Sequence, residues 1–449
     1  MSADDAPPKR AAIYTLGCRL NQADTALLGA DLVEHGYRLV PWGTPAELLV
    51  VNSCTVTAES AAKTRKAVHG ARRRCPDAVV VVVGCAAELE AAAWQADGEV
   101  DLIVGNVAKT RLSQILPRGL ERPRQPSVHV GAVPRREAPP AAFSEAGTGV
   151  YPERTRANLK IQEGCDFGCS YCIVPRVRGP ARSRQWSDAL READELRRRG
   201  HREIVLAGVN IATYSDQGRD LADLVEAILA LGPGFRVRLG STEPGSVLPR
   251  QIRLMGREPR LCRFLHLPLQ YGEDNVLRAM QRRYTVAEYT GIAQAAATAL
   301  PGLCLGSDII VGFPGETAAS FESCRETVRC LPINHLHVFT YSVREGTPAA
   351  VLPGTVPGDL AARRAAELSR LGLEKAKALA RSQIGQTLEI ITEARTPRGF
   401  WQGWSDNYLS VEIPDAPDLA ANQWVRVRIE TDLGGRRLRG CRERGARPD

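Results

Sequence analysis

The chain has 449 residues, of which 44% are hydrophobic and 24% are charged, and its formal net charge at pH 7 is +8. This length predicts two to four domains, and the composition excludes a disordered or fibrous protein. The positive charge permits a nucleic-acid partner. The first ten residues are polar and no run approaches 18 apolar residues, so we expect no signal peptide, no membrane span and a cytoplasmic location with reduced cysteines.

Short apolar runs alternate with helical patterns in the first third of the chain. Strands are predicted at residues 12–16, 48–51, 78–83 and 101–104, and helices at 21–35, 58–74 and 86–96. Residues 78–83 are nearly all valine, as expected for a strand that is buried on both faces of a parallel sheet. Repeated strand–helix units predict a doubly wound parallel α/β domain, which we place at residues 10–120.

One cysteine follows each of the first three predicted strands: Cys18, Cys54 and Cys85. In a parallel sheet these strand ends lie at one edge, where open α/β sheets bind ligands. Three converging thiolates would bind an iron–sulfur cluster and leave one iron open. The alternative is that the small thiols only pack at the strand ends. Cys75, which precedes Pro76, is interpreted as structural.

A linker is predicted next, at residues 121–150, because six prolines between 117 and 151 interrupt any helix. A second series of strand–helix units follows, and we assign residues 151–381 to it. Its predicted strands are 158–162, 203–207, 236–239, 264–267, 305–311 and 335–341, and its predicted helices include 188–199, 221–231 and 286–300. Six parallel strands with crossover helices predict an open (β/α)6 partial barrel with a site at the carboxyl ends of its strands.

Cys165, Cys169 and Cys172 stand at C-x-x-x-C-x-x-C spacing directly after the first of these strands. Thiolates suit iron–sulfur clusters, and no fourth cysteine lies within ninety residues downstream. A zinc site would need a second hook, and none follows; three free cysteines are the other alternative. The spacing resembles that of the radical S-adenosylmethionine (SAM) superfamily, in which the free iron holds the amino and carboxylate groups of SAM.

Polar residues at the other strand ends are candidates for binding SAM, which needs polar partners in an otherwise dry cavity. They are Gly208, Asn210, Ser241, Glu243, Gln270 and Asp308. A basic loop with Arg176, Arg178, Arg182 and Arg184 follows the cysteine motif. It would grip RNA phosphates, form a solvated turn, or hold the carboxylate of SAM; Arg178 is our candidate for the last role.

The tail begins with a charged amphipathic helix at residues 357–383 and continues with short strands. Strands at 387–392, 399–404, 408–413, 424–429 and 436–440 predict a small β-barrel, which we place at residues 383–446. Trp401 and Trp404, with nearby arginines, would stack on and clamp nucleic acid. Alternatively, one of these tryptophans fills the barrel core.

Together the three blocks resemble the radical-SAM methylthiotransferase family across nearly the whole chain. The resemblance is carried by TLGCRLN at 15–21, VNSCTV at 51–56, VGC at 83–85, the motif at 165–172, and an end similar to the TRAM domain, an RNA-binding β-barrel. One departure is Tyr271, near the predicted barrel mouth, where the family usually has serine.

The resemblance implies two [4Fe–4S] clusters and SAM as cofactors. The cluster at Cys165, Cys169 and Cys172 would bind SAM and cleave it reductively to a 5′-deoxyadenosyl radical and methionine. The second cluster, at Cys18, Cys54 and Cys85, would present a sulfur that one SAM methylates. The radical from another SAM would then activate an unreactive C–H bond for insertion of the methylthio group. An electron donor such as flavodoxin or ferredoxin is implied as a partner.

Family members act on isopentenylated adenosine in tRNA, on threonylcarbamoylated adenosine in tRNA, or on an aspartate of a ribosomal protein. Four stretches are most similar to the threonylcarbamoyladenosine branch: 17–22, 160–166, 171–175 and 335–339. The implied substrate is the adenosine just 3′ of the anticodon, methylthiolated at C2, and the implied partner is the tRNA anticodon stem-loop. A non-catalytic RNA-binding protein with structural clusters is the remaining alternative.

Overall fold

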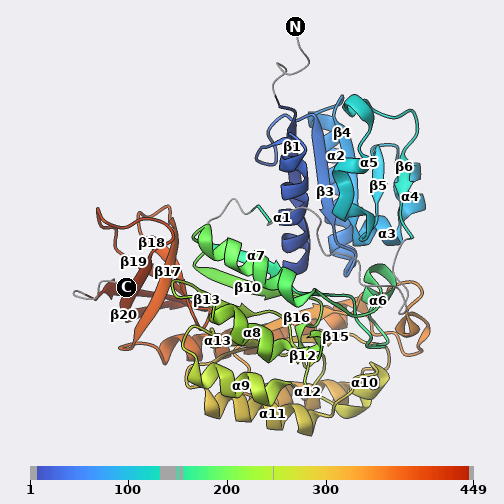
Figure 1. Ribbon diagram of the computed structural model, residues 1–449. Coiled ribbons are helices and arrows are strands. Elements are labelled where there is room, and N and C mark those ends of the chain that lie inside the picture. Colours follow the sequence, from blue (N-terminus) through green and yellow to red (C-terminus); the bar gives the residue numbers. More distant parts are fainter. Residues whose placement is uncertain (1–7, 132–148, 151–154, 246, 444–449) are drawn as a thin grey trace.

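The computed structural model describes residues 8–131, 149–150, 155–245 and 247–443. Three bodies are visible in Figure 1: a sheet domain in blue and cyan, a larger half-open barrel in green to orange, and a small barrel in red at its side. They correspond to the predicted fold class, which is confirmed. Among the described residues, no helix is both long and apolar enough to cross a membrane.

The first body is a six-stranded parallel sheet in the order β2-β1-β3-β4-β5-β6. Its strands are β1 (Arg10–Thr15), β2 (Arg38–Leu39), β3 (Leu48–Ser53), β4 (Val79–Gly84), β5 (Leu102–Val104) and β6 (Ser127–His129). Its helices are α1 (Arg19–Glu34), α2 (Ala58–Arg74), α3 (Cys85–Leu89), α4 (Ala91–Asp97) and α5 (Leu112–Ile115), with 3-10 turns η1 (Ala108–Arg111) and η2 (Arg118–Leu120).

Helices cover both faces of this sheet. Val80 and Val82 of β4 pack against Val68 of α2 and Trp94 of α4, whereas the alternate valines of β4 pack in a second cluster with Leu28 of α1. Successive side chains of a strand point to opposite faces, so an all-valine strand is what a sheet covered on two sides requires.

Two predictions in this part of the chain are wrong. The helix predicted at 86–96 is divided, because Glu90 leaves the helical conformation between α3 and α4 and its carboxylate pairs with Arg65. The predicted linker contains β6, which pairs with β5 in parallel. Of the remaining linker, residues 132–148 lie outside the described ranges.

The central body has six parallel strands in two hydrogen-bonded groups, β13-β10-β7 and β14-β15-β16. Two isolated parallel bridges, Val237↔Leu261 and Ser241↔His266, connect β13 and the residues after it to β14 and the residues before it. The two groups together therefore form one open partial barrel. The strands are β7 (Arg156–Lys160), β10 (Glu203–Ala207), β13 (Arg236–Leu239), β14 (Phe264–His266), β15 (Cys304–Val311) and β16 (His335–Thr340).

Crossover helices cover the outside of this barrel: α7 (Trp186–Arg198), α8 (Leu221–Leu229), α9 (Leu248–Arg257), α10 (Asp274–Ala279), α11 (Val286–Ala299) and α12 (Ala318–Cys330). Short elements decorate its ends: β8 (Gln162–Glu163), α6 (Val174–Arg178), β9 (Arg182–Ser183), η3 (Ile211–Thr213), β11 (Ser215–Asp216), β12 (Arg219–Asp220) and η4 (Pro348–Val351). Helix α13 (Gly358–Arg381) then leads to the C-terminal barrel.

The C-terminal body is a closed five-stranded barrel in the order β17-β18-β19-β21-β20, consistent with a TRAM-like domain. Its strands are β17 (Thr387–Arg395), β18 (Trp401–Ser405), β19 (Ser410–Ile413), β20 (Trp424–Gly434) and β21 (Arg437–Arg442). Trp401 is buried in its core, together with Val425 and Val427. The prediction that one tryptophan fills the core is therefore confirmed for Trp401, whereas Trp404 is half-buried.

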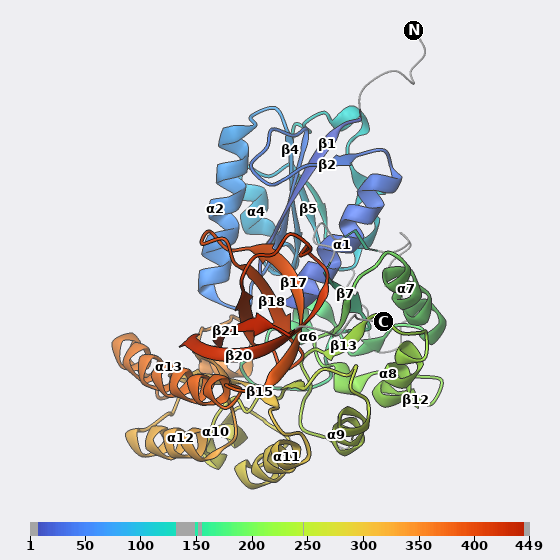
Figure 2. The same cartoon turned by 90° about the vertical axis from the view of Figure 1, so that its left-hand side faces the viewer.

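The turn between β18 and β19 fixes the C-terminal barrel to the central body. Arg238 donates to the backbone oxygens of Ser405 and Asp406 at 3.1 and 2.9 Å. The Asp406 carboxylate pairs with Arg263 at 2.6 Å. Figure 2 shows the result: the small barrel lies in front of the lower end of the sheet domain and beside the strands of the central body.

Candidate active site

Two backbone hydrogen bonds and one close backbone approach fix the loop with Cys165, Cys169 and Cys172. The Cys165 N–H donates to the Gly179 oxygen at 3.0 Å, and the Ser170 N–H to the Met280 oxygen at 3.0 Å. Gly164 has φ +70°, and a Cβ built there would lie 1.9 Å from the Pro180 oxygen. A residue without a Cβ is therefore required at the entry to this loop.

Buried sulfur and a nearby cation characterise this triad. Burial raises the pKa of Cys165, and it raises the pKa of Cys172 to about 12. The Arg282 guanidinium donates to Cys169 Sγ at 3.1 Å and also pairs with Glu243. Such thiols ionise on coordinating a metal centre, which deprotonates a ligating thiol outright. Three soft donors beside a fixed positive charge fit an anionic iron–sulfur cluster.

The other three predicted ligands also converge. Strands β1, β3 and β4 are neighbours in the sheet, and Cys18, Cys54 and Cys85 follow their carboxyl ends. Burial raises the pKa of Cys54, and the nearby Cys85 and Cys18 add to the effect. A Cβ on Gly17 would lie 2.9 Å from Cys54 Sγ, so glycine lets the first cysteine loop approach the second.

In neither triad do the thiols stand as ligands of one ion: the described residues contain no group of three or more His, Cys, Asp or Glu placed to hold a single metal ion. In a [4Fe–4S] cluster each cysteine binds a different iron, so its thiols need not share one ion. The soft donor set at each triad fits such a cluster.

A packing contact connects the triad of the sheet domain to the segment that follows the second triad. Cys85 packs in one apolar cluster with Ile173, the residue after Cys172, and with Val177. Asn106 Nδ2 lies 2.7 Å from the Val177 oxygen and 3.6 Å from Cys85 Sγ. Cys85 of the sheet domain and the segment after Cys172 thus line the same region.

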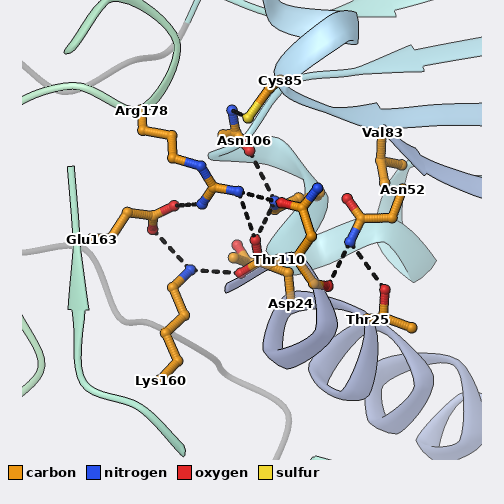
Figure 3. A network of polar contacts seen from close by, with 12 residues as sticks. Asp24, Thr25, Asn52, Val83, Cys85, Asn106, Thr110, Lys160, Glu163 and Arg178 are labelled. Atoms are coloured by element: carbon orange, nitrogen blue, oxygen red, sulfur yellow. Dashed lines mark hydrogen bonds and ion pairs between the residues drawn. The ribbon is translucent and has the colours of Figure 1, made fainter. Parts of the chain in front are cut away.

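A buried ionic network lies beside Cys85 and Asn106 (Figure 3). Asp24 of α1 pairs with Lys109 at 2.6 Å, Lys160 at 2.7 Å and Arg178 at 3.2 Å. Glu163 pairs with Lys160 at 2.8 Å and Arg178 at 2.7 Å. Burial opposes ionisation of both acids, yet the cations hold the pKa of each carboxyl below its usual range.

This network has one more positive than negative side chain among its five members. Burial disfavours the charged Arg178, but the nearby Cys85 thiol, Asp24 and Glu163 raise the pKa of Arg178 well above its usual value. A cluster held by three thiolates is anionic and would compensate the surplus charge. The electrostatics of the sheet-domain site therefore also fit an iron–sulfur cluster.

The expectation for the basic loop is wrong for two of its four arginines. Arg178 and Arg184 are 3% and 1% exposed; Arg184 pairs with Asp188 at 2.7 Å and with Glu192. They therefore form neither a solvated turn nor a phosphate grip. Arg176 reaches the Glu345 oxygen at 3.0 Å. That Arg178 holds the carboxylate of SAM stays a prediction.

Five of the residues predicted to bind SAM follow the carboxyl ends of barrel strands, whereas Asp308 lies in the middle of β15. Asn210 is buried, and its Nδ2 has no hydrogen-bond partner within the described ranges; its Oδ1 accepts from the Ala212 and Glu243 N–H groups at 3.2 and 3.3 Å. A buried donor without a partner is costly, and a polar cofactor group would satisfy it. Gly208 is equally constrained, because a Cβ there would lie 2.9 Å from Gln162.

Ser241, Gln270 and Asp308 complete this rim. Ser241 forms a parallel bridge with His266, whose Nε2 lies 3.2 Å from Asp308 Oδ2. Gln270 has φ +68°, an uncommon conformation for a residue with a Cβ, and one found at ligand-binding sites. The structure corrects the position of Tyr271: this side chain is fully buried in the barrel core and is not exposed at the mouth.

Sequence reasoning missed Arg282, Glu163, Asn106 and Ile173. Arg282 stands in Gln281-Arg282-Arg283, a run that looks like an exposed turn. Glu163 and Ile173 adjoin the cysteine motif, and this proximity was the available signal. Asn106 carried none, because it meets Val177 from 71 positions away.

Two family models match the chain. "Radical SAM superfamily" matches residues 159–328, and "Uncharacterized protein family UPF0004" matches residues 10–105. The solved radical S-adenosylmethionine methyltransferase TsrM from Kitasatospora setae has a similar fold, with a TM-score of 0.54 and 14% identity over 77% of this chain and 74% of that one. These findings define a radical-SAM enzyme, and membership implies SAM and a [4Fe–4S] cluster as cofactors.

Three relatives narrow this class. The threonylcarbamoyladenosine tRNA methylthiotransferase MtaB of Bacillus subtilis is 33% identical, with 93% of each chain covered. A tRNA-2-methylthio-N(6)-dimethylallyladenosine synthase of Cereibacter sphaeroides is 32% identical over 95% of this chain and 98% of its own. The ribosomal protein uS12 methylthiotransferase RimO of Desulforudis audaxviator is 32% identical over 96% and 93%. The chain belongs to the radical-SAM methylthiotransferase family, whose members are transferases.

Proposed function

We propose that this protein inserts a methylthio group at C2 of N6-threonylcarbamoyladenosine, at position 37 of tRNA, using two SAM molecules and two [4Fe–4S] clusters. The observation that carries the proposal is the packing of Cys85, from one cysteine triad, against Ile173, the residue that follows the other triad. A triad that supplies sulfur and one that supplies a radical must serve the same substrate atom, and these two adjoin. Bound there, the cofactors would supply the radical and the sulfur.

The residues of the chain orient these groups and exclude water. Gly164 and Gly17 let the cysteine loops close on their neighbours. Arg282 fixes Cys169 and Glu243 in one hydrogen-bonded unit. The network around Asp24 spans α1, β7 and α6 and so holds the sheet domain against the central body. A rigid second layer of this kind keeps the reacting groups in register.

The first of the three relatives and the C-terminal barrel support this substrate. Identity alone separates the three substrate classes poorly, because it is 33%, 32% and 32%. The motif 335–339 lies on β16. His335 of this motif is hydrogen-bonded to Arg436, one of the arginines of the TRAM-like barrel. The barrel carries Arg437 and Arg439 on β21. Both pair with the single carboxylate of Glu412 at 2.9 Å, which leaves one positive charge in excess, and this suits a polyanionic partner. We therefore place the anticodon stem-loop of tRNA at this end of the molecule.

Nucleoside mass spectrometry of tRNA from cells that lack the protein tests the proposal. We expect loss of 2-methylthio-N6-threonylcarbamoyladenosine and accumulation of its precursor. Re-expression of the wild-type chain restores the product, whereas the Cys54→Ala chain does not. An unchanged tRNA profile, together with loss of methylthioaspartate from a ribosomal protein, would overturn the tRNA assignment in favour of the protein substrate.

A further inference from the structure

A row of five rings runs from the C-terminal barrel onto the central body. Trp404 and Tyr408 stack with centroids 4.9 Å apart, and Tyr408 stacks on His335 at 5.6 Å. His335 lies 4.5 Å from His337, which stacks on Phe339 at 6.5 Å. Tyr408, in the turn between β18 and β19, has φ +61°, a left-handed conformation that is uncommon for a bulky residue.

Two arginines meet at this row without a carboxylate partner. Arg19 donates to the Tyr408 hydroxyl at 2.9 Å, and its Cζ lies 5.3 Å from the centre of that ring. Arg436 lies 5.1 Å from the same ring and donates to His335 Nδ1 at 2.9 Å. Within the described part of the chain, neither guanidinium forms a salt bridge. Arg238, the third guanidinium over Tyr408, is neutralised by Glu203 at 2.7 Å.

The histidines of the row add no positive charge. Partial burial, followed by the charge of Arg436, lowers the pKa of His335 to about 2. Desolvation also lowers the pKa of His337, although this side chain is exposed at the surface. Since Arg436 donates to Nδ1, neutral His335 carries its proton on Nε2, which lies 2.8 Å from His337 Nε2. His337 then accepts at Nε2 and keeps its own proton on Nδ1. It therefore presents a further donor.

The electrostatic field at the row is positive. Burial disfavours ionisation of Tyr408, yet Arg19, Arg156 and Arg238 lower the pKa of this phenol below its usual value. Two carboxylates lie along the row, and each already has a partner. Glu393 accepts from the Trp404 Nε1–H at 2.9 Å and pairs with Arg156 at 2.8 Å, and Asp308 is bound by His266 at 3.2 Å. Two like charges held at one ring without a counter-charge repel each other, and an anionic ligand would remove that cost.

The arginine pair also lies near the reaction site. Arg19 follows Cys18 directly in the chain. On the other side, His337 lies 5.9 Å from His266, the partner of Asp308 on the rim of the barrel. The pair thus stands where the sheet domain, the central body and the C-terminal barrel meet, between the sulfur triad and the predicted SAM site.

We infer that Arg19 and Arg436 bind the carboxylate of the threonylcarbamoyl substituent on the substrate adenine, so that the pair selects an acidic substituent over an apolar one. The inference rests on the proposed function and extends it to the groups that read the substrate. A guanidinium matches a carboxylate with two parallel hydrogen bonds. An isopentenyl group in the same place would leave both charges uncompensated.

A thermodynamic cycle on the cluster-loaded, full-length enzyme tests the inference. Its probes are two synthetic anticodon stem-loops, one with N6-threonylcarbamoyladenosine and one with its methyl ester, in which a neutral ester with one added methyl group replaces the carboxylate. Binding to each is measured for wild type, Arg436→Gln and Arg436→Lys. We expect wild type to prefer the acid by about tenfold or more. Arg436→Gln binds both RNAs about equally, and Arg436→Lys keeps part of the preference.

The matched control is Arg428→Gln, which removes an exposed charge from the same barrel. If Arg428 contacts the RNA backbone, this substitution lowers the binding of both RNAs equally. In either case the acid-to-ester ratio of the affinities is unchanged. Iron content and circular dichroism verify that each variant is folded and loaded. An acid-to-ester ratio unchanged in both Arg436→Gln and Arg19→Gln overturns the inference. Equal losses for the two RNAs in Arg436→Gln also overturn it, because they identify a phosphate contact.

The activity of the wild-type enzyme distinguishes a failure of this inference from a failure of the proposed function. If wild type methylthiolates the acid RNA but the Arg436 variants show no change in ratio, the function stands and the carboxylate site is wrong. If wild type acts only on an isopentenyladenosine stem-loop, the proposed substrate and this site fail together.

Discussion

Lys160 Nζ lies 2.7 Å from Asp24 Oδ1, and both side chains are 2% exposed or less. Lys160 ends β7 of the central body and Asp24 lies on α1 of the sheet domain, so a buried ion pair crosses from one body to the other. Because Lys160 also binds Glu163, two residues before Cys165, this pair connects the packing of the sheet domain to the entry of the radical-SAM motif.

Replacing Asp24 by Asn should destabilise the protein strongly. The change leaves Lys109, Lys160 and Arg178 with one carboxylate, and breaking a buried network from one side costs about 3–5 kcal/mol. Calorimetric unfolding should show a lower Tm, and the iron content should fall. The control is Glu47→Gln, whose pair with Arg10 at 2.6 Å is half exposed and is worth at most about 1 kcal/mol. Equal Tm values for the two variants would contradict this role.

Glycine should be indispensable at one position of the cysteine motif and replaceable at another. Gly164→Ala places a Cβ 1.9 Å from the Pro180 oxygen at φ +70°, whereas a Cβ on Gly168 meets nothing closer than 3.7 Å. A backbone oxygen cannot move aside as the end of a side chain can, so Gly164→Ala should displace the loop that carries Cys165. The variant should therefore lose one of two clusters, or about half of the bound iron. Gly168→Ala should retain it. Iron and sulfide analysis decides between them, and full iron in Gly164→Ala would refute the packing argument.

The sheet domain and the barrel strands were predictable because their patterns are strong and local. The bounds of α2, β10 and β13 match the predictions, since amphipathic periodicity and short buried runs between breakers depend on few distant contacts. Helix α9 was missed, although Leu248, Ile252 and Met255 are buried in helical spacing, because Pro249 and three arginines make the stretch resemble a loop.

The charge network was not predictable from sequence. Asp24 meets Lys109 and Lys160 from 85 and 136 positions away, and a charged residue on a helix ordinarily faces solvent. The prediction for Arg178 and Arg184, after the cysteine motif, was wrong for the same reason. Only the fold shows that these arginines are buried and pair with Glu163, Asp188 and Glu192. The convergence of Cys18, Cys54 and Cys85 was easier to predict, because the carboxyl ends of the strands of a parallel sheet lie at one edge.

Acid should weaken the contact between the central body and the C-terminal barrel. His335 has a pKa of about 2 against an ordinary 6.5. A histidine with a lowered pKa stabilises the fold above its ordinary pKa, and this contribution is lost as the pH falls. Linkage predicts a loss of about 1.4 kcal/mol per pH unit below 6.5. His335→Asn retains an acceptor for Arg436 and does not titrate, so its Tm should fall less between pH 6.5 and 5. Parallel curves would exclude His335 as the cause.

The two cysteine triads should be separable by mutation. Wild type reconstituted without oxygen should hold about eight iron, and Cys54→Ala and Cys169→Ala about four each. Cys169→Ala should lose SAM cleavage, because it removes a ligand of the triad beside Arg282. Cys54→Ala should still form 5′-deoxyadenosine but no methylthiolated RNA, because only the triad in the sheet domain is broken.

The matched control for both variants is Cys330→Ser, since Cys330 is exposed at the end of α12 and belongs to neither triad. It should retain full iron and both reactions. Four iron in wild type would exclude a second cluster, and methylthiolated product from Cys54→Ala would exclude Cys18, Cys54 and Cys85 as the source of sulfur. Because Cys85 and Ile173 share one packed cluster, loss of one triad should change the paramagnetic resonance of the other cluster, as two unconnected sites would not.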